Sequence, residues 1–258
     1  MTRPRAIVLR APGTNCDEET AAAWERAGAA AEAWHIGRLL EAPHALDAFQ
    51  VLTIPGGFSY GDDLGAGRIF ATRLGSVLAD ELHRFHERGG LVLGICNGFQ
   101  VLVRAGLLPG GDGASAATLT HNDSGHFEAR WVRMVPTPGL SPFITGRDPI
   151  ELPVAHGEGK FVVSHPETLR ALHEAGQVVL RYANGAGEVT QEYPANPNGS
   201  AGGVAGVCDR TGRVFGLMPH PERFVDPFHH PRWTRRPASD APCDGLRIFQ
   251  SAVAALRS

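Results

Sequence analysis

Short apolar runs alternate with longer amphipathic segments over the first 106 residues of the chain. The apolar runs predict strands at residues 5–9, 31–36, 49–54 and 91–95. The amphipathic segments predict helices at residues 16–29, 74–88 and 97–105. The sequence of residues 91–95, LVLGI, is typical of a central strand that is covered on both faces. This alternation predicts an α/β fold with a doubly wound, mostly parallel sheet and flanking helices.

The second half of the chain has a different pattern. Residues 107–126 are rich in Gly, Ala, Ser and Asp and predict a loop. Short strands are predicted at residues 127–135, 150–156, 160–163, 177–182, 201–208 and 213–218. Helices are predicted near residues 166–175 and at residues 245–256. The short turns between strands favour antiparallel strands here, and the absence of a linker-like segment favours one domain over residues 1–258.

Composition and charge exclude several classes of protein. The chain has 24 basic and 27 acidic residues, a net charge of −3, and the two signs are interspersed, so no nucleic-acid partner is expected. No apolar run reaches the ~18 residues of a membrane span, and the first residues contain no apolar stretch of the length expected for a signal peptide. The four cysteines form no CxxC pair, which argues against a zinc ribbon and favours free thiols in the cytoplasm. They are Cys16, Cys96, Cys208 and Cys243.

One of these cysteines lies in a sequence that is typical of a nucleophile. Gly94 and Gly98 flank Cys96 at two residues on either side, between a predicted strand and a predicted helix. This is the pattern of a nucleophile elbow, in which the central side chain is held out at the carboxyl edge of the sheet. The N-terminus of the following helix also favours a thiolate. The alternative interpretation is a buried structural cysteine at a tight turn.

A cysteine nucleophile needs a base and a site for the developing oxyanion. His220 follows the strand predicted at residues 213–218, and residues two apart in an extended segment point the same way. Glu222 is therefore predicted to hydrogen-bond one nitrogen of His220, while the other nitrogen faces Cys96. The N–H of Asn97 is the natural first oxyanion donor. A second donor is expected from residues 55–57 (PGG), at the end of a neighbouring strand.

Twelve histidines make a surface or core role the plainer interpretation for any one of them. The pairs His83/His86 and His229/His230 could suggest a metal ion. Neither pair has a third ligand at a suitable spacing, so we expect no metal site.

These segments together resemble the class I, triad-type glutamine amidotransferases. The resemblance is carried by PGG at residues 55–57, GICNGFQ at residues 94–100 and PHPE at residues 219–222. Within this class, the chain resembles most specifically the glutaminase components of phosphoribosylformylglycinamidine synthase. That more specific resemblance covers nearly the whole chain. The segments that narrow it are PGTNCDEET (12–20), PGGFSYGDDLGAG (55–67), HGEGKF (156–161) and GRVFGLMPHPERF (212–224).

The resemblance implies a single glutamine amidotransferase domain in which Cys96 attacks L-glutamine and forms a glutamyl thioester. His220 and Glu222 complete the triad, and the backbone N–H groups of Gly57 and Asn97 bind the oxyanion. Three further residues are implied to bind substrate: Gln100, Asn122 and Ser124. For Asn122 and Ser124, capping of a loop is an equally good interpretation.

The resemblance also implies partners and cofactors. Ammonia would pass to a separate formylglycinamide ribonucleotide synthetase subunit in purine biosynthesis. The expected cofactors, ATP and Mg²⁺, belong to that partner, and none is expected in this chain. The chain itself reads as a stand-alone cytoplasmic subunit. A partner built from small subunits, with a small accessory subunit, and a partner that is one large chain both stay open.

Some alternatives remain. The chain could serve another acceptor as a class I amidotransferase, could be a non-catalytic assembly or regulatory subunit, or could be a redox protein with a cysteine elbow. The proline-rich residues 224–244 predict a loop. Its residues Arg232, Trp233, Arg235 and Arg236 could form a docking surface, although a solvated loop is the plainer interpretation.

Overall fold

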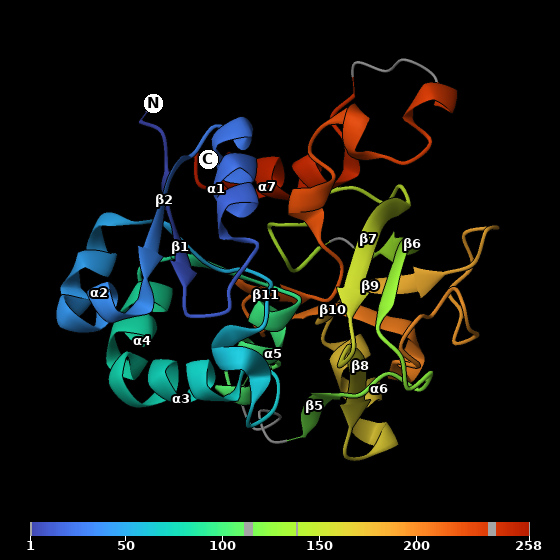
Figure 1. Ribbon diagram of the computed structural model, residues 1–258, viewed down its shortest axis with the longest axis horizontal. Coiled ribbons are helices and arrows are strands. Elements are labelled where there is room, and N and C mark those ends of the chain that lie inside the picture. Colours follow the sequence, from blue (N-terminus) through green and yellow to red (C-terminus); the bar gives the residue numbers. More distant parts are fainter. Residues whose placement is uncertain (1, 111–115, 138, 237–240, 258) are drawn as a thin grey trace.

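A nine-stranded mixed sheet forms the centre of the protein (Figure 1). The computed structural model describes residues 2–110, 116–137, 139–236 and 241–257. In spatial order, the strands of the sheet are β2 (Ala30–His35), β1 (Arg5–Arg10), β3 (Val51–Ile54), β4 (Leu91–Ile95), β11 (Val214–Leu217), β10 (Val204–Cys208), β9 (Val178–Ala183), β6 (Glu128–Pro136) and β7 (Ile150–His156). The strands β5 (Ala117–Thr120) and β8 (Lys160–Val163) form a separate two-stranded sheet.

The sheet is parallel in one half and antiparallel in the other. From β2 to β11 every neighbouring pair is parallel, and from β11 to β7 every pair is antiparallel. The predicted α/β fold class, with antiparallel strands from the second half of the chain, is confirmed. Strand β11 lies in the second half of the chain, where antiparallel pairing was expected, yet it runs parallel to β4. As a result, the ends of β4 and β11 lie at the same edge of the sheet.

Helices flank the strands of both sheets. They are α1 (Asp17–Ala27), α2 (Ile36–Glu41), α3 (Arg68–Val77), α4 (Ala79–Glu87), α5 (Asn97–Arg104), α6 (Pro166–Glu174) and α7 (Asp244–Ala255). Figure 1 shows α1 and α7 side by side near the two termini, with α3, α4 and α5 across the parallel strands from them. Within the described part of the chain, none of the helices is both long and apolar enough to cross a membrane.

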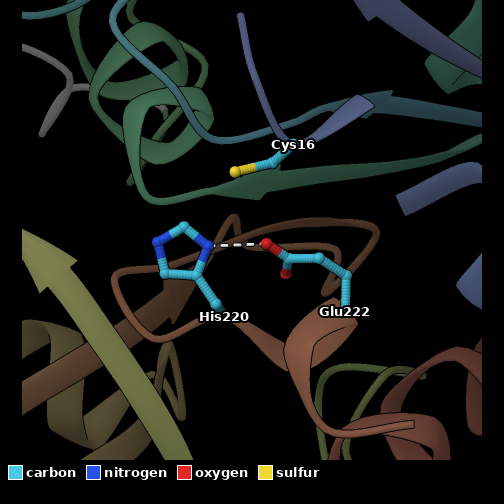
Figure 2. A group of neighbouring side chains, drawn as sticks. All are labelled: Cys16, His220 and Glu222. Atoms are coloured by element: carbon cyan, nitrogen blue, oxygen red, sulfur yellow. Dashed lines mark hydrogen bonds and ion pairs between the residues drawn. The ribbon is translucent and has the colours of Figure 1, made fainter. Parts of the chain in front are cut away.

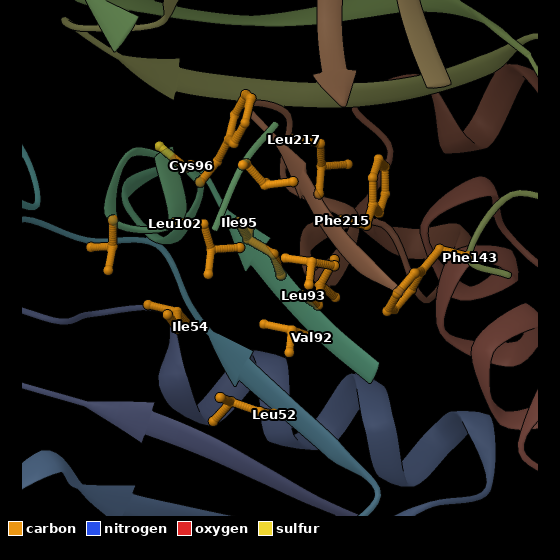
Figure 3. Close-up of a cluster of buried hydrophobic side chains, with 14 of the residues drawn as sticks. Leu52, Ile54, Val92, Leu93, Ile95, Cys96, Leu102, Phe143, Phe215 and Leu217 are labelled. Atoms are coloured by element: carbon orange, nitrogen blue, oxygen red, sulfur yellow. The ribbon is translucent and has the colours of Figure 1, made fainter. Parts of the chain in front are cut away.

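The core includes β4, whose five residues are all buried. Figure 3 shows side chains of β3, β4 and β11 packed together there. A Cβ at Gly216 of β11 would lie 2.2 Å from the ring of Phe99, so the glycine allows α5 to pack directly on this strand. This packing fixes the start of α5 against the ends of β4 and β11.

Several predicted boundaries were wrong. The helix expected at residues 74–88 is two helices, because Leu78 leaves the helical conformation (ψ 7°) between α3 and α4. The loop expected at residues 107–126 contains β5, while residues 111–115 lie outside the described residues. The strand expected at residues 201–208 begins only at Val204, because Gly202 and Gly203 have positive φ angles (61° and 70°) in a 3₁₀ turn.

Candidate active site

The turn between β4 and α5 has the predicted geometry of an elbow. Cys96 has φ 51° and ψ −105°, a conformation that is strained for a residue with a side chain. A Cβ at Gly98 would lie 1.8 Å from the carbonyl oxygen of Ile54, and one at Gly94 would lie 2.5 Å from Leu102. Both flanking positions therefore require glycine for lack of space. The strain at Cys96 is maintained by close backbone packing on both sides.

Cys96 lies next to the end of β7, the edge strand of the antiparallel half of the sheet. Its side chain is 5% exposed, and its Sγ donates a weak hydrogen bond to the carbonyl oxygen of Ala155 in β7 at 3.7 Å. The thiol therefore lies at the edge of the sheet and makes only this weak hydrogen bond.

His220 and Glu222 form a buried pair directly after β11. Nδ1 of His220 donates to Oε1 of Glu222 at 2.6 Å, and the two side chains are 2% and 0% exposed. The backbone N–H of His220 donates to the carbonyl oxygen of Pro153 in β7 at 2.8 Å. Pro221 begins the short 3₁₀ turn Pro221–Arg223 that carries Glu222. The hydrogen bond predicted between His220 and Glu222 is present.

The charges around His220 favour an imidazolium. Burial lowers the pKa of His220, but the negative charges of Glu222 and of a Cys96 thiolate raise it by more, so that the pKa lies well above its ordinary value. Nε2 of His220 is buried and has no hydrogen-bond partner among the described residues. The imidazole is thus oriented through Nδ1 and leaves Nε2 available for proton transfer.

A second cysteine contacts the same pair, and sequence reasoning did not single it out. Figure 2 shows the Cys16 side chain pointing toward His220 and Glu222 from the segment after β1. Cys16 is buried, and burial raises the pKa of its thiol. A Cβ at Gly56 would lie 2.7 Å from Cε1 of His220 and 3.1 Å from Sγ of Cys16. The only sequence signal for this residue is its place in the PGTNCDEET segment.

Cys16, His220 and Glu222 carry donor atoms of the types that bind metal ions. In the described part of the chain these atoms lie within 4.8 Å of one another. Nδ1 and Oε1 hold each other at 2.6 Å, so we assign the group to hydrogen bonding. The histidine pairs considered in the sequence also have protein partners, since His83 pairs with Glu87 at 3.1 Å and the ring of His230 packs at a tilt against Trp131.

The side chain of Asn97 is hydrogen-bonded to the loop that follows Gly57, the other predicted oxyanion residue. Gly57 has φ 140°, and a Cβ there would lie 2.8 Å from Cα of Thr14, so the loop needs glycine at this point. Oδ1 of Asn97 accepts from the backbone N–H of Ser59 at 3.2 Å, and its Nδ2 donates to Asp62 at 3.2 Å. These bonds fix the loop that follows Gly57 to the first turn of α5. Oxyanion binding by the two N–H groups stays a prediction.

Gln100 is buried one turn after the elbow. Its Nε2 donates to the carbonyl oxygen of Glu158 at 2.5 Å, and its Oε1 accepts from Asn97 at 2.9 Å. The side chain therefore connects α5 to the HGEGKF segment. Contact of Gln100 with the substrate stays a prediction.

The side-chain amide of Asn122 is hydrogen-bonded within the protein. Its Nδ2 donates to the carbonyl oxygens of His126 and His156 at 2.9 and 2.8 Å. Its Oδ1 accepts from the backbone N–H of Gly159 and from Nδ1 of His156 at 3.0 and 3.1 Å. All four hydrogen-bonding positions of the amide are thus used inside the protein. Ser124 accepts the N–H of His126 at 3.3 Å, as a loop-capping residue does, and substrate binding by either residue stays a prediction.

The segment at residues 224–244 packs on the protein through part of its charged surface. Arg236 pairs with Glu151 at 3.3 Å, and Trp233 packs edge-on against Phe228 at 5.1 Å between ring centroids. Trp233 is 48% exposed and Phe228 is 69% exposed. Residues 237–240 of the predicted loop lie outside the described residues.

Comparisons with known proteins find relatives over nearly the whole chain. Residues 3–254 match a CobB/CobQ-like glutamine amidotransferase domain. The chain is 48% identical to phosphoribosylformylglycinamidine synthase subunit PurQ of Dehalococcoides mccartyi over 256 residues, which is 98% of each chain. It is 41% identical to the subunit of the same name from Methanococcus maripaludis, over 97% of this chain and 96% of that one. A chain in the structure of PurLQS from Thermotoga maritima superposes with a TM-score of 0.75 at 34% identity, over 99% of this chain and all of that chain.

The fold is therefore that of a class I glutamine amidotransferase. Within this class, the chain belongs to the phosphoribosylformylglycinamidine synthase subunit PurQ family.

Proposed function

We propose that this chain is the glutaminase subunit of phosphoribosylformylglycinamidine synthase. The observation that carries the proposal is the strained Cys96 elbow at the same sheet edge as the buried His220–Glu222 pair. The family membership supports the same conclusion. An intact elbow and pair argue against a subunit that only assembles or regulates its partner.

In the first half of the reaction, the Cys96 thiolate attacks the side-chain amide carbon of L-glutamine and a C–S bond forms. The carbonyl oxygen takes up the negative charge and is stabilised by the N–H groups of Gly57 and Asn97. His220, as the imidazolium, gives its Nε2 proton to the amide nitrogen. The C–N bond then breaks, ammonia leaves, and a glutamyl thioester remains on Cys96.

In the second half, His220 takes a proton from a water molecule, and the resulting hydroxide attacks the thioester carbon. The C–S bond breaks, glutamate leaves, and the Cys96 thiolate and the His220 imidazolium are restored. Glu222 stays ionised throughout and stabilises the imidazolium through the hydrogen bond at 2.6 Å.

Ammonia then passes to a synthetase subunit, which uses ATP and Mg²⁺ to convert formylglycinamide ribonucleotide to its amidine in the cytoplasm. We assign these cofactors to the partner and none to this chain. The support is the set of relatives named PurQ and the related chain in PurLQS from Thermotoga maritima. A small accessory subunit belongs to the proposed assembly. A class I amidotransferase that serves another acceptor is the alternative.

Replacement of the nucleophile tests the proposed chemistry. Cys96→Ala removes the atom that forms the thioester, so glutamine-dependent glutamate release by the chain in complex with its synthetase should fall by more than about 1,000-fold. Cys243→Ala, at the partly exposed start of α7, is the matched control and should keep wild-type activity. Both variants should keep the wild-type circular dichroism spectrum. Hydrolysis by Cys96→Ala at the wild-type rate would show that the nucleophile is wrongly assigned.

A further inference from the structure

The buried carboxylate of Glu222 has an arginine beside it that the mechanism above does not use. Nε of Arg223 lies 4.0 Å from Oε1 of Glu222. The Glu222 side chain is 0% exposed, and its Oε2 has no hydrogen-bond partner among the described residues. An ionised carboxylate is costly to bury without a compensating positive charge. His220 compensates it only while the imidazole is protonated, whereas an arginine is charged throughout the working pH range.

Arg223 is held in place by residues of a distant segment. Its Nε donates to Oε1 of Glu19 at 3.0 Å, and its Nη2 donates to Sγ of Cys16 at 3.1 Å. Cys16 is the N-cap of α1, and Glu19 lies in its first turn. Two contacts across more than 200 residues of sequence therefore orient one guanidinium.

The two tethers act differently. Glu19 is 39% exposed, so water screens its charge, whereas Cys16 is fully buried. Burial raises the pKa of the Cys16 thiol, which keeps it neutral, and its S–H donates to Oδ1 of Asn15 at 3.2 Å. A neutral thiol orients the guanidinium without cancelling its charge.

We propose that Arg223, oriented by Cys16 and Glu19, is a positioning residue that supplies a permanent positive charge beside the buried Glu222 carboxylate and so holds this carboxylate in its hydrogen bond to His220. The inference rests on the proposed glutaminase function and adds a residue to it. Arg223 acts through Glu222 and has no contact of its own with the reacting atoms.

The other titratable groups near His220 and Glu222 supply no permanent positive charge. Glu222 faces His220, Arg223 and the Cys16 thiol. His220 also interacts with Cys96 and with His156, and the pKa of His156 is lowered to about 3, mainly by burial, which leaves it neutral. Helix α7 packs on the Pro221–Arg223 turn through Gly245, and its Asp244 accepts instead from the N–H of Glu151. Arg223 is thus the permanent cation closest to Glu222 in these interactions.

The test follows two pH profiles in the full chain. One is kcat for glutamine hydrolysis in the complex, and the other is the rate of alkylation of Cys96 by iodoacetamide, read from the Cys96 peptide by mass spectrometry. Without the cation, the buried Glu222 carboxylate is held less firmly in its hydrogen bond to Nδ1 and stabilises the His220 imidazolium less. In Arg223→Gln the acidic limb of both profiles should therefore move up by about one pH unit. On that limb kcat should fall about tenfold, while KM for glutamine changes less than about twofold.

Matched variants separate charge from structure. Arg223→Lys keeps the positive charge, so the acidic limb of both profiles should lie close to that of the wild type. Arg26→Gln, which breaks a surface pair with Asp226 at 2.9 Å, should leave both profiles unchanged. If Arg223→Gln does not fold, Cys16→Ala replaces it, and a smaller movement in the same direction is expected.

The proposal would be overturned if the acidic limb of Arg223→Gln, or of Cys16→Ala where that variant replaces it, coincided with that of the wild type. A change in KM without movement of the limb would also overturn it, because that is the result of a purely structural role. Alkylation needs neither glutamine nor a partner. A wild-type chain that fails to hydrolyse glutamine would therefore count against the proposed function, and an unmoved alkylation profile would count against the role of Arg223.

Discussion

At the scale of single residues, hydrogen bonds fix the protonation of a histidine near the site. The Nδ2 atom of Asn122 faces two carbonyl oxygens, so the orientation of the amide is settled and Oδ1 must accept from His156 Nδ1. The imidazole of His156 is therefore the tautomer with a proton on Nδ1, and its buried Nε2 carries a lone pair. A Cβ at Gly159 would lie 2.4 Å from this ring, which explains a glycine at that point of the HGEGKF segment.

The buried His156 predicts that stability decreases in acid. Burial, followed by the positive charge of His220, lowers its pKa from 6.5 to about 3. Below pH 6.5 the unfolded chain binds a proton that the folded chain refuses until about pH 3. The free energy of unfolding should therefore fall by up to ~1.4 kcal/mol per pH unit across this range because of His156 alone.

Urea unfolding from pH 7 to pH 4 measures this contribution. His156→Asn should show a shallower fall in stability than the wild type, and the exposed His83→Asn should match the wild type. The raised pKa of His220 acts in the opposite direction, since its contribution is lost as pH rises, so only the difference between variants isolates His156. Equal slopes in wild type and His156→Asn would contradict the assignment.

Local sequence is enough to predict some of the site residues but not others. The placement of Cys96, His220 and Glu222 follows from glycine spacing, a strand end and an i, i+2 relation, which are all local. Cys16 and Arg223 are 207 residues apart, so only the packing of α1 on the turn after β11 brings them together.

At the scale of elements, two glycines in helices predict opposite effects of the same substitution. Gly98→Ala places a Cβ 1.8 Å from the carbonyl oxygen of Ile54 and should lower the free energy of unfolding by about 3 kcal/mol or more. Gly75→Ala, in α3, places a Cβ in open space and should raise it by about 0.5 kcal/mol. Chemical denaturation of both variants checks this pair. A Gly98→Ala protein as stable as the wild type would mean that the elbow does not depend on the close packing described here.

Elements with strong local patterns were predicted well, and those fixed by distant contacts were not. The run at residues 91–95 is β4, because a fully buried strand is apolar throughout. The break at Leu78 was missed because the hydrophobic period continues through it. Strand β5 was missed because its partner, β8, lies about 40 residues farther along the chain.

At the scale of the whole molecule, the antiparallel half of the sheet completes the site that the parallel half begins. The parallel strands β4 and β11 deliver Cys96 and His220 to one edge. Strand β7 is the last strand of the sheet, yet its Pro153 and Ala155 carbonyls accept from the backbone of His220 and the thiol of Cys96. The sheet must therefore curve so that β7 returns over the elbow. No local pattern in the sequence indicates this curvature.

In the proposed reaction, ammonia is released at Cys96 and used on the synthetase, and this division predicts chemical rescue. In a complex of Cys96→Ala with the synthetase, glutamine should no longer support amidine formation, whereas added ammonium salt at pH 8 to 9 should restore it, because free ammonia bypasses the thioester. The wild-type complex supplied with the same salt sets the rate to be reached. Product is measured by chromatography of the ribonucleotides. A mutant complex that stays inactive with ammonia, beside a wild-type complex that uses it, would mean that Cys96 does more for the synthetase than release ammonia.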